Sequence, residues 1–169
     1  MSSKHIQRTL ILFKPDAVQR GVVGEILTRF ERVGLKIIGT KMIAPDSDHF
    51  YKHYEEIGQV VTRRGQKTMN NVLQMMSDGP VIAMVLEGVE AVELVRKLVG
   101  ATEPKSSPPG TIRGDFSHMS YGYGDEQEKG IPNLIHASGD LSDASKEIPH
   151  WFSDDELYDY SVLNEKFTR

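Results

Sequence analysis

Short apolar segments that alternate with helix-like segments set the strongest limit on how this chain can fold. Residues 8–13 form a nearly continuous apolar run, which is typical of a strand buried on both faces. Residues 36–44 and 80–86 predict two more strands, and residues 133–135 predict the end of a fourth. The longer segments between these runs predict helices, so the chain is expected to form a domain of mixed helix and sheet.

The helix-like segments carry apolar residues at spacings of three and four positions, with start and stop signals at their ends. They cover residues 21–30, 49–56, 90–99 and about 141–152. A further helix is expected just before Gly79-Pro80, whereas residues 58–70 are polar and have no clear period. The pattern therefore predicts a strand, a helix, a strand, helices, a strand, a helix, a strand and a final helix.

This order contains the βαββαβ pattern of the ferredoxin-like α+β class, in which helices cover one face of a four-stranded antiparallel sheet. A doubly wound parallel sheet is the alternative, and the periodicity alone does not separate the two. No internal repeat or domain boundary is visible, so we expect one domain over residues 1–169. A long loop over residues 101–132 and a tail over residues 153–169 complete it.

Composition narrows the class of protein further. The chain has 169 residues, 38% of them apolar, which is enough for one buried core. It has no cysteine, which excludes disulfides and thiolate metal sites and suits a reducing compartment. No apolar run reaches the length of a membrane span or a signal-peptide core, so we expect a cytoplasmic protein without a membrane partner. The net charge of −4 argues against nucleic acid as a partner.

One histidine stands where phosphate chemistry is favoured. His136 follows an apolar strand-like run, and Asp140 begins a helix with an acidic first turn. The free N–H groups at a helix start favour phosphate, and an imidazole titrates near neutral pH and can act as a nucleophile. A structural histidine beside an apolar run fits the same pattern, so this motif alone leaves both interpretations open.

Three further segments point to a family. Residues 8–16 read RTLILFKPD, residues 100–104 read GATEP and residues 109–116 read PGTIRGDF. Together with NLIHAS at residues 133–138, they closely resemble nucleoside diphosphate kinases over about residues 8–160, in the family's order. The resemblance implies the ferredoxin-like fold rather than the parallel sheet.

The same resemblance implies an enzyme that moves the γ-phosphate of a nucleoside triphosphate such as ATP onto a nucleoside diphosphate, maintaining NTP and dNTP pools. His136 stands at the position of the family's nucleophile, so the transfer would be a ping-pong reaction through a phosphohistidine. Glu147 matches the carboxylate that orients this imidazole. Ser138 matches the hydroxyl associated with the pair.

Phosphoryl transfer needs positive charge around the phosphate oxygens. The resemblance assigns this role to Lys14, Arg96 and Arg113. Mg²⁺ is expected to arrive with the nucleotide and bridge its phosphates, so no protein metal site is predicted.

Three polar residues complete the implied nucleotide site. Thr102 matches a hydroxyl near the phosphates, and Asn133 matches the residue that contacts the sugar and phosphate side of the nucleotide. Tyr54 matches a tyrosine placed close to Lys14, although ordinary packing on its helix explains it equally well. The other five histidines match no catalytic position, and we expect them to be surface or packing residues: His5, His49, His53, His118 and His150.

The chain departs from the family where the nucleobase would stack. Residues 58–65 contain no aromatic residue, and the stretch between Tyr54 and Gly79 is about six residues longer than usual, a change that a surface loop can absorb. An apolar side chain is the expected substitute, with three candidates: Val60, Val61 and Met69.

A second insertion, over residues 117–130, is about ten residues longer than the usual link. Tyr121 or Tyr123 is an alternative source of the stacking ring. The competing interpretation is a surface excursion, for example at a contact between subunits.

Members of this family assemble from dimers into hexamers or tetramers, so a homo-oligomer is expected. The alternative function is a non-catalytic regulatory paralogue that binds nucleotide or nucleic acid. Its sequence support is limited to the altered region around Arg63 and Arg64 and the enlarged loop, and the negative net charge opposes it.

Overall fold

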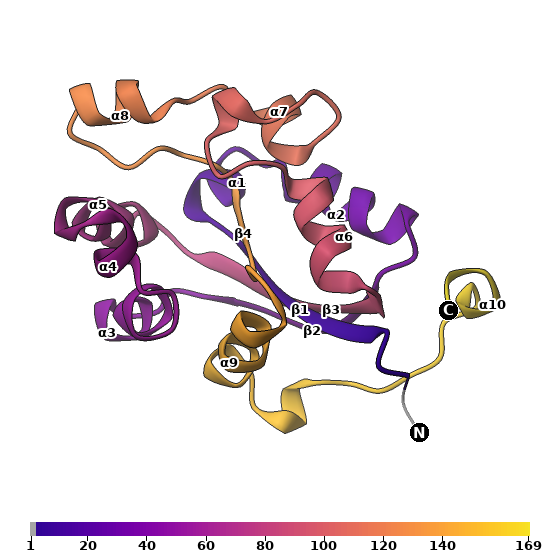
Figure 1. Ribbon diagram of the computed structural model, residues 1–169. Coiled ribbons are helices and arrows are strands. Elements are labelled where there is room, and N and C mark those ends of the chain that lie inside the picture. The colour runs from indigo at the N-terminus through magenta and orange to yellow at the C-terminus, as the bar shows by residue number, and fades with distance from the viewer. Residues whose placement is uncertain (1–2) are drawn as a thin grey trace.

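The computed structural model describes residues 3–169, which build one four-stranded sheet flanked by helices (Figure 1). The strands are β1 (Ile6–Phe13), β2 (Lys36–Ile43), β3 (Val81–Val89) and β4 (Ile135–Ala137). They lie in the order β2-β3-β1-β4, and each neighbouring pair is antiparallel. The predicted four-stranded antiparallel sheet is therefore confirmed, and a doubly wound parallel sheet is excluded.

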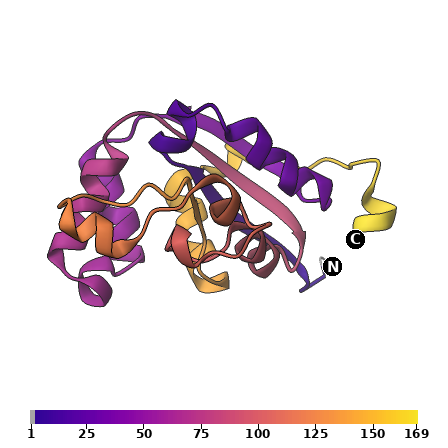
Figure 2. The same ribbon diagram turned by 90° about the horizontal axis from the view of Figure 1, so that it is seen from above.

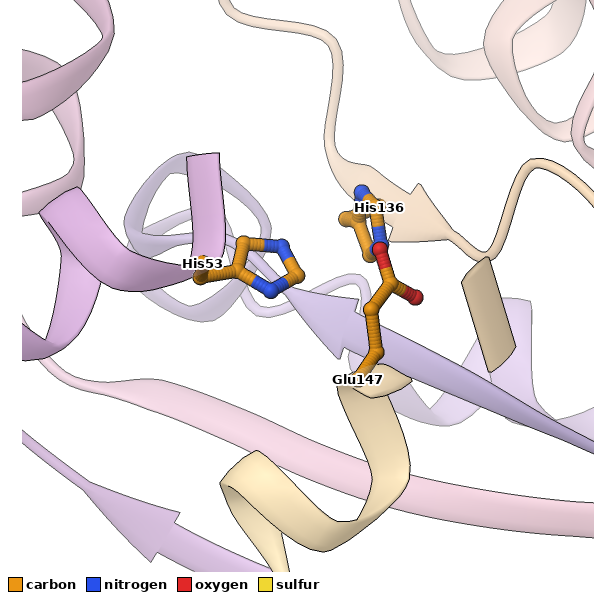
Figure 3. Close-up of side chains that lie close together, drawn as sticks. All are labelled: His53, His136 and Glu147. Atoms are coloured by element: carbon orange, nitrogen blue, oxygen red, sulfur yellow. The ribbon is translucent and has the colours of Figure 1, made fainter. Parts of the chain in front are cut away.

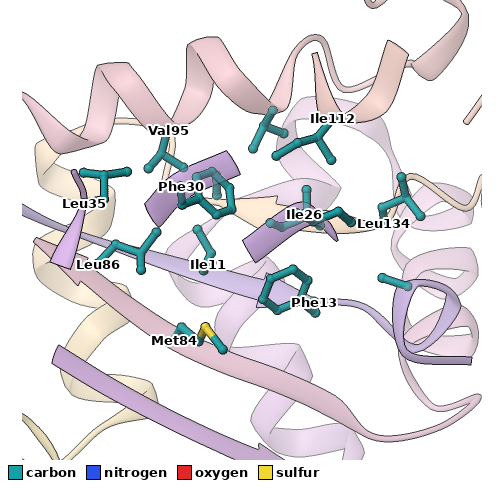
Figure 4. Close-up of a cluster of buried hydrophobic side chains, with 14 of the residues drawn as sticks. Ile11, Phe13, Ile26, Phe30, Leu35, Met84, Leu86, Val95, Ile112 and Leu134 are labelled. Carbon is teal, nitrogen blue, oxygen red and sulfur yellow. The ribbon is translucent and has the colours of Figure 1, made fainter. Parts of the chain in front are cut away.

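One face of the sheet is covered by α2 (Val23–Arg32) and α6 (Ala91–Val99) (Figures 1 and 2). Alternate residues of β1 point to this side, among them Ile11 and Phe13. They join Phe30 and other buried side chains in a first core (Figure 4). A short helix, α1 (Pro15–Gln19), follows β1 directly and was not predicted.

The opposite face is covered as well, by α3 (Ser47–Tyr51), α5 (Gln66–Met76) and α9 (Leu141–Trp151). Leu10 and Leu12 point to this side and lie in a second core. The expectation that helices cover only one face was wrong. The apolar run in β1 has no polar alternation because both of its faces are buried.

Residues 47–76 contain more helix than the sequence predicted. The expected helix over residues 49–56 is α3 followed by a π-helical turn (Lys52–Ile57). The stretch with no clear period holds α4 (Val60–Arg64) and the start of α5. Gly65, with a φ of 85°, separates these two helices. Their periodicity was hidden because the break shifts the apolar face from one short helix to the next.

The long loop and the tail are mostly irregular. The loop holds a 3₁₀ turn (Pro104–Ser106), α7 (Ile112–Phe116) and α8 (Tyr121–Glu126). The tail holds a second 3₁₀ turn (Asp154–Glu156) and α10 (Glu165–Thr168), which stands apart from the sheet in Figure 1.

The tail is fixed to β2 and to one buried acid. The Tyr158 amide donates to the carbonyl of Ile38 at 2.7 Å. Glu87, on β3, lies within 3.2 Å of cationic nitrogens on Arg8, Lys36 and Arg169. The tail therefore follows the outer edge of the sheet. Within residues 3–169, the helices are all too short or too polar to cross a membrane.

Two imidazoles stack where α3 meets α9. The rings of His49 and His150 lie 3.9 Å apart at 21°. Burial, with a smaller contribution from repulsion by His150, lowers the pKa of His49 to about 4, and burial lowers the pKa of His150. Both side chains are therefore neutral in the folded protein near neutral pH.

This stack predicts a loss of stability in acid. The unfolded chain binds protons on these imidazoles below pH ~6.5, whereas the folded chain does not until lower pH. The free energy of unfolding should therefore fall as the pH drops from about 6.5 towards 4. Thermal unfolding across this range should show a smaller fall for His49→Gln than for wild type. His118→Gln, outside the stack, should match wild type; an unchanged slope in His49→Gln would contradict the assignment.

Candidate active site

A cavity of about 770 Å³ gathers most of the residues that the sequence analysis selected. Eight of them line it although they are widely separated in the chain: Lys14, Tyr54, Arg96, Thr102, Arg113, Asn133, His136 and Glu147. The ninth, Ser138, is fully buried behind the lining. The sequence prediction thus identified residues that the fold brings together.

His136 is held through one ring nitrogen. It lies on β4, and its Nε2 is 3.0 Å from Glu147 Oε1 of α9 (Figure 3). Ser138 Oγ donates to the other carboxylate oxygen at 2.7 Å and accepts from the Leu10 amide at 3.0 Å. Asp140 caps α9 by accepting from the Asp143 amide, which fixes the start of the helix that carries Glu147.

This arrangement selects the tautomer of His136. Burial of Glu147 opposes its ionisation, but the attraction of His136 and the hydrogen bonds from His136 and Ser138 outweigh burial and lower the pKa of the carboxyl. An ionised carboxylate only accepts hydrogen bonds, so Nε2 carries a proton, and in the neutral form of the imidazole Nδ1 is then the nitrogen with the lone pair. The His136 side chain is 19% exposed and lines the cavity, so it is accessible to a ligand there.

Lys14 and Asn133 form a second fixed pair. Lys14 Nζ donates to Asn133 Oδ1 at 2.7 Å, and Asn133 Nδ2 donates to the Thr102 carbonyl at 2.9 Å. Burial and the nearby charge of Arg113 lower the pKa of Lys14 to about 7. An anionic ligand beside this buried amine would favour its protonated form, so the amine would regain its positive charge when the ligand binds.

The backbone next to Asn133 is strained. Leu134 is fully buried and has a φ of 71°, a conformation that L residues with branched side chains rarely adopt. Its amide donates to Asp16 Oδ2 at 3.0 Å, and its carbonyl accepts from the Lys14 amide at 2.9 Å. These bonds hold the turn that directs the chain from Asn133 into β4.

Arg113 does more than line the cavity. Its guanidinium donates to the carbonyls of Gly100, Ala101, Asn133 and Ile135 at 2.6–3.2 Å. It therefore ties the loop after α6 to the strand that carries the histidine. The family resemblance implied a phosphate contact for Arg113, and this structural role was not predicted.

Arg96 and Tyr54 differ in how firmly they are held. Arg96 is an exposed side chain at the end of α6. The Tyr54 hydroxyl is buried and has no hydrogen-bond partner within residues 3–169, and burial raises its pKa. A buried hydroxyl without a partner is costly, so it is suited to a ligand that enters the cavity.

His53 was expected to be a surface or packing residue, and it is a buried packing residue that contacts the candidate nucleophile. Its ring lies beside that of His136 (Figure 3), with 4.6 Å between the ring centres and 82° between the planes. Its Nδ1 accepts from Trp151 Nε1 at 3.1 Å. The π-helical turn places His53 and Tyr54, adjacent in sequence, among the buried residues of the same cavity. Only the pattern of a buried helix face could have indicated this.

Possible metal ligands are limited. Among the described residues, the group able to hold an ion comprises His53, His136 and Glu147, whose ligand atoms lie within 4.8 Å of one another. The Trp151 N–H occupies His53 Nδ1, and His136 and Ser138 already bond the carboxylate of Glu147. The set is also not the oxygen-rich one that Mg²⁺ prefers. It is better suited to orienting an imidazole than to binding a metal.

Both segments that were predicted to be insertions contribute to the cavity lining. Val60 is part of this lining, whereas Met69 is fully buried in the second core and Val61 packs beside that core. Tyr121 lines the cavity from α8. Tyr123 lies outside the lining, with its ring 5.2 Å from Lys129 Nζ.

Fold and site together define a ferredoxin-like α+β protein with an oriented histidine in a cation-lined cavity. Comparisons with known proteins agree. The family model described as "Nucleoside diphosphate kinase" matches residues 7–157. The nucleoside diphosphate kinase of Borreliella burgdorferi is 48% identical over 155 residues, 92% of each chain. That of Pyrococcus furiosus is 44% identical, covering 97% of this chain and 94% of the relative.

Solved structures give the same answer. A transition-state mimic of the nucleoside-diphosphate kinase from Borrelia burgdorferi, with bound vanadate and ADP, superimposes with a TM-score of 0.95. It is 46% identical and each chain covers 98% of the other. The chain therefore belongs to the nucleoside diphosphate kinase family, a family of phosphotransferases.

The bonding of Arg113 predicts a structural cost for its removal. Arg113→Ala would remove the bonds to four carbonyls, of which those of Asn133 and Ala101 keep donors in the Ile135 amide and the Ser107 hydroxyl, and it should lower the free energy of unfolding by about 2–3 kcal/mol. Chemical denaturation would measure this change. Arg96→Ala, a change of the same kind at an exposed position of the same cavity, should stay within about 0.5 kcal/mol of wild type. Equal stability of the two variants would refute the structural role of Arg113.

Proposed function

We propose that this protein transfers the γ-phosphate of a nucleoside triphosphate such as ATP to a nucleoside diphosphate, with His136 as the phosphorylated intermediate. The observation that carries the proposal is the 3.0 Å contact between His136 Nε2 and Glu147, which leaves Nδ1 as the nucleophilic nitrogen. Membership of the nucleoside diphosphate kinase family supports it.

In the first half-reaction, the lone pair of His136 Nδ1 forms a bond to the γ-phosphorus. The bond from that phosphorus to the bridging oxygen breaks, and its electrons leave with the nucleoside diphosphate. The Nε2 proton stays in its bond to Glu147, which stabilises the positive charge on the phosphorylated ring. In the second half-reaction, a β-phosphate oxygen of the acceptor attacks the phosphorus and the electrons return to Nδ1. One site serves both nucleotides in turn, so ping-pong kinetics follow.

Three cations would stabilise the transferring phosphoryl group. Lys14 and Arg113 are buried at the cavity wall, and Arg96 is exposed beside them. Positive charge placed before the reaction costs little reorganisation. We propose that Asn133 and the Thr102 hydroxyl bind the nucleotide next to these cations.

We propose Mg²⁺ as the divalent cation, held by the nucleotide phosphates rather than by a protein cage. The mixed imidazole and carboxylate set around Glu147 supports this, because Mg²⁺ prefers several oxygen ligands. When bound, the ion would supply charge neutralisation on the phosphate oxygens.

Three further proposals concern the domain organisation, the assembly and the location of the protein. A single domain over residues 1–169 is supported by two cores that share one sheet. Assembly of dimers into a hexamer or tetramer is supported by exposed apolar side chains in the tail, including Leu163 and Phe167. A cytoplasmic location is supported by the lack of cysteine.

Phosphoenzyme formation tests the central proposal. Incubation with γ-labelled ATP and Mg²⁺ should give an acid-labile label on wild type, and GDP or CDP should remove it. His136→Ala should carry no label while binding ADP. His53→Ala is a useful comparison because it alters an adjacent imidazole and retains the nucleophile, so it should still be labelled. An unlabelled wild-type protein that binds nucleotide would favour the regulatory, non-catalytic alternative instead.

Lys14 predicts a pH dependence of nucleotide binding. Because its pKa in the free protein is about 7, the amine loses its charge above that pH, and binding of phosphate then requires uptake of a proton. ADP affinity should fall by up to about tenfold per pH unit above 7. Lys14→Arg, whose charge does not titrate in this range, should flatten the dependence. Calorimetry in two buffers would detect the proton, and no proton uptake by wild type would contradict the assignment.

A further inference from the structure

We propose that Tyr121 of α8 is the aromatic platform on which the nucleobase stacks, and that it makes this site favour purines over pyrimidines. The proposal rests on the proposed function, because it concerns the nucleotide that reaches His136. It selects one of the two interpretations that the sequence left open for this insertion, and one of its two tyrosines.

The first observation is the composition of the cavity lining. His136 and the cations share this lining with residues of both insertions. α4 and α5 contribute Val60, Val72 and Met75, and α8 contributes Tyr121. Figure 1 shows α8 at the same end of the molecule as α4 and α5. A nucleotide with its phosphates at His136 therefore has these residues available for its base within the same cavity.

The second observation is that α8 is fixed rather than loose. Its N-terminus is capped by Ser120, whose side chain accepts from the Tyr123 amide at 3.2 Å, and Glu103 Oε1 accepts from the Tyr121 amide at 2.9 Å. The end of the excursion lies against α5. At Gly130, an added Cβ would come within 3.0 Å of the Asn71 carbonyl oxygen. The segment thus forms a wall of the cavity.

The third observation is that the Tyr121 ring is held in place. Arg64 Nη1 donates to the Tyr121 hydroxyl at 2.8 Å, and the central guanidinium carbon lies 5.6 Å from the ring centre. This contact joins the two insertions across the cavity. A ring whose orientation is fixed before binding loses little entropy when a base stacks on it.

α4 and α5 also supply apolar side chains to the lining. Val72 and Met75 of α5 line the cavity, together with Val60 of α4. A planar base has two apolar faces, so one can stack on the Tyr121 ring and the other can contact these side chains. Stacking depends on the π-face of the base and not on its pattern of hydrogen-bond donors and acceptors, so the site can accept several bases. Purines have the larger face and therefore gain more.

The test is single-turnover phosphorylation of the full chain by ATP, GTP, CTP and UTP at a series of concentrations. Tyr121→Ala should raise the half-saturating concentration of ATP and GTP by about tenfold, as expected for the loss of one stacking contact. The increase for CTP and UTP should be smaller, and the rate at saturation should not change. Tyr123→Ala, a change of the same kind in the same helix but outside the cavity, should match wild type.

Tyr121→Phe separates the ring from its hydroxyl. This variant keeps the stacking surface and loses the bond to Arg64. Its half-saturating concentrations should therefore stay within about threefold of wild type, a smaller change than the loss of one stacking contact would cause. The proposal is overturned if Tyr121→Ala matches Tyr123→Ala, if it affects purines and pyrimidines equally, or if Tyr121→Phe loses as much as Tyr121→Ala. Failure of the proposed function would look different, because wild type itself would then form no phosphoenzyme.

Discussion

The carboxylate of Glu147 is the group on which the site depends. It accepts from His136 through one oxygen and from Ser138 through the other, and the same serine accepts from the Leu10 amide. These contacts join α9, β4 and β1 at one buried charge. Because the unpaired carboxylate would be costly at this depth, each donor is needed to keep it ionised. The chemistry of the imidazole and the docking of α9 on the sheet are consequences of the same contacts.

The fold could be predicted as far as local patterns extend. Apolar runs located the four strands, and amphipathic spacing located α2, α6 and α9. The predictions failed where the structure depends on tertiary contacts. The second covered face of the sheet depends on α3 and α5, and α5 begins at a glycine break that disrupts the period. The π-helical turn has no sequence signature that separates it from an α-helix.

The candidate site could be predicted by resemblance more than by pattern. Motifs around residues 14, 113 and 136 identified residues that share one cavity. The family resemblance implied a role for each matched residue, but it did not indicate which other residues each one contacts. It assigned Arg113 to phosphate and missed its bonds to four carbonyls, and it gave no reason to connect His53 with His136. Both relations join positions at least 12 residues apart in the sequence, so only the folded chain reveals them.

The tail has a consequence for the behaviour of the protein in concentrated solution. The Tyr158 amide and the Tyr160 hydroxyl donate to the carbonyls of Ile38 and Ile37, at the irregularity near the start of β2, one of the two edge strands. A free strand edge is a template on which another chain can add a strand. By occupying these acceptors, the tail caps part of that edge. Proteolytic loss of the tail would therefore expose these acceptors of β2 to other chains. Aggregation, rather than unfolding, would then be the first sign of damage.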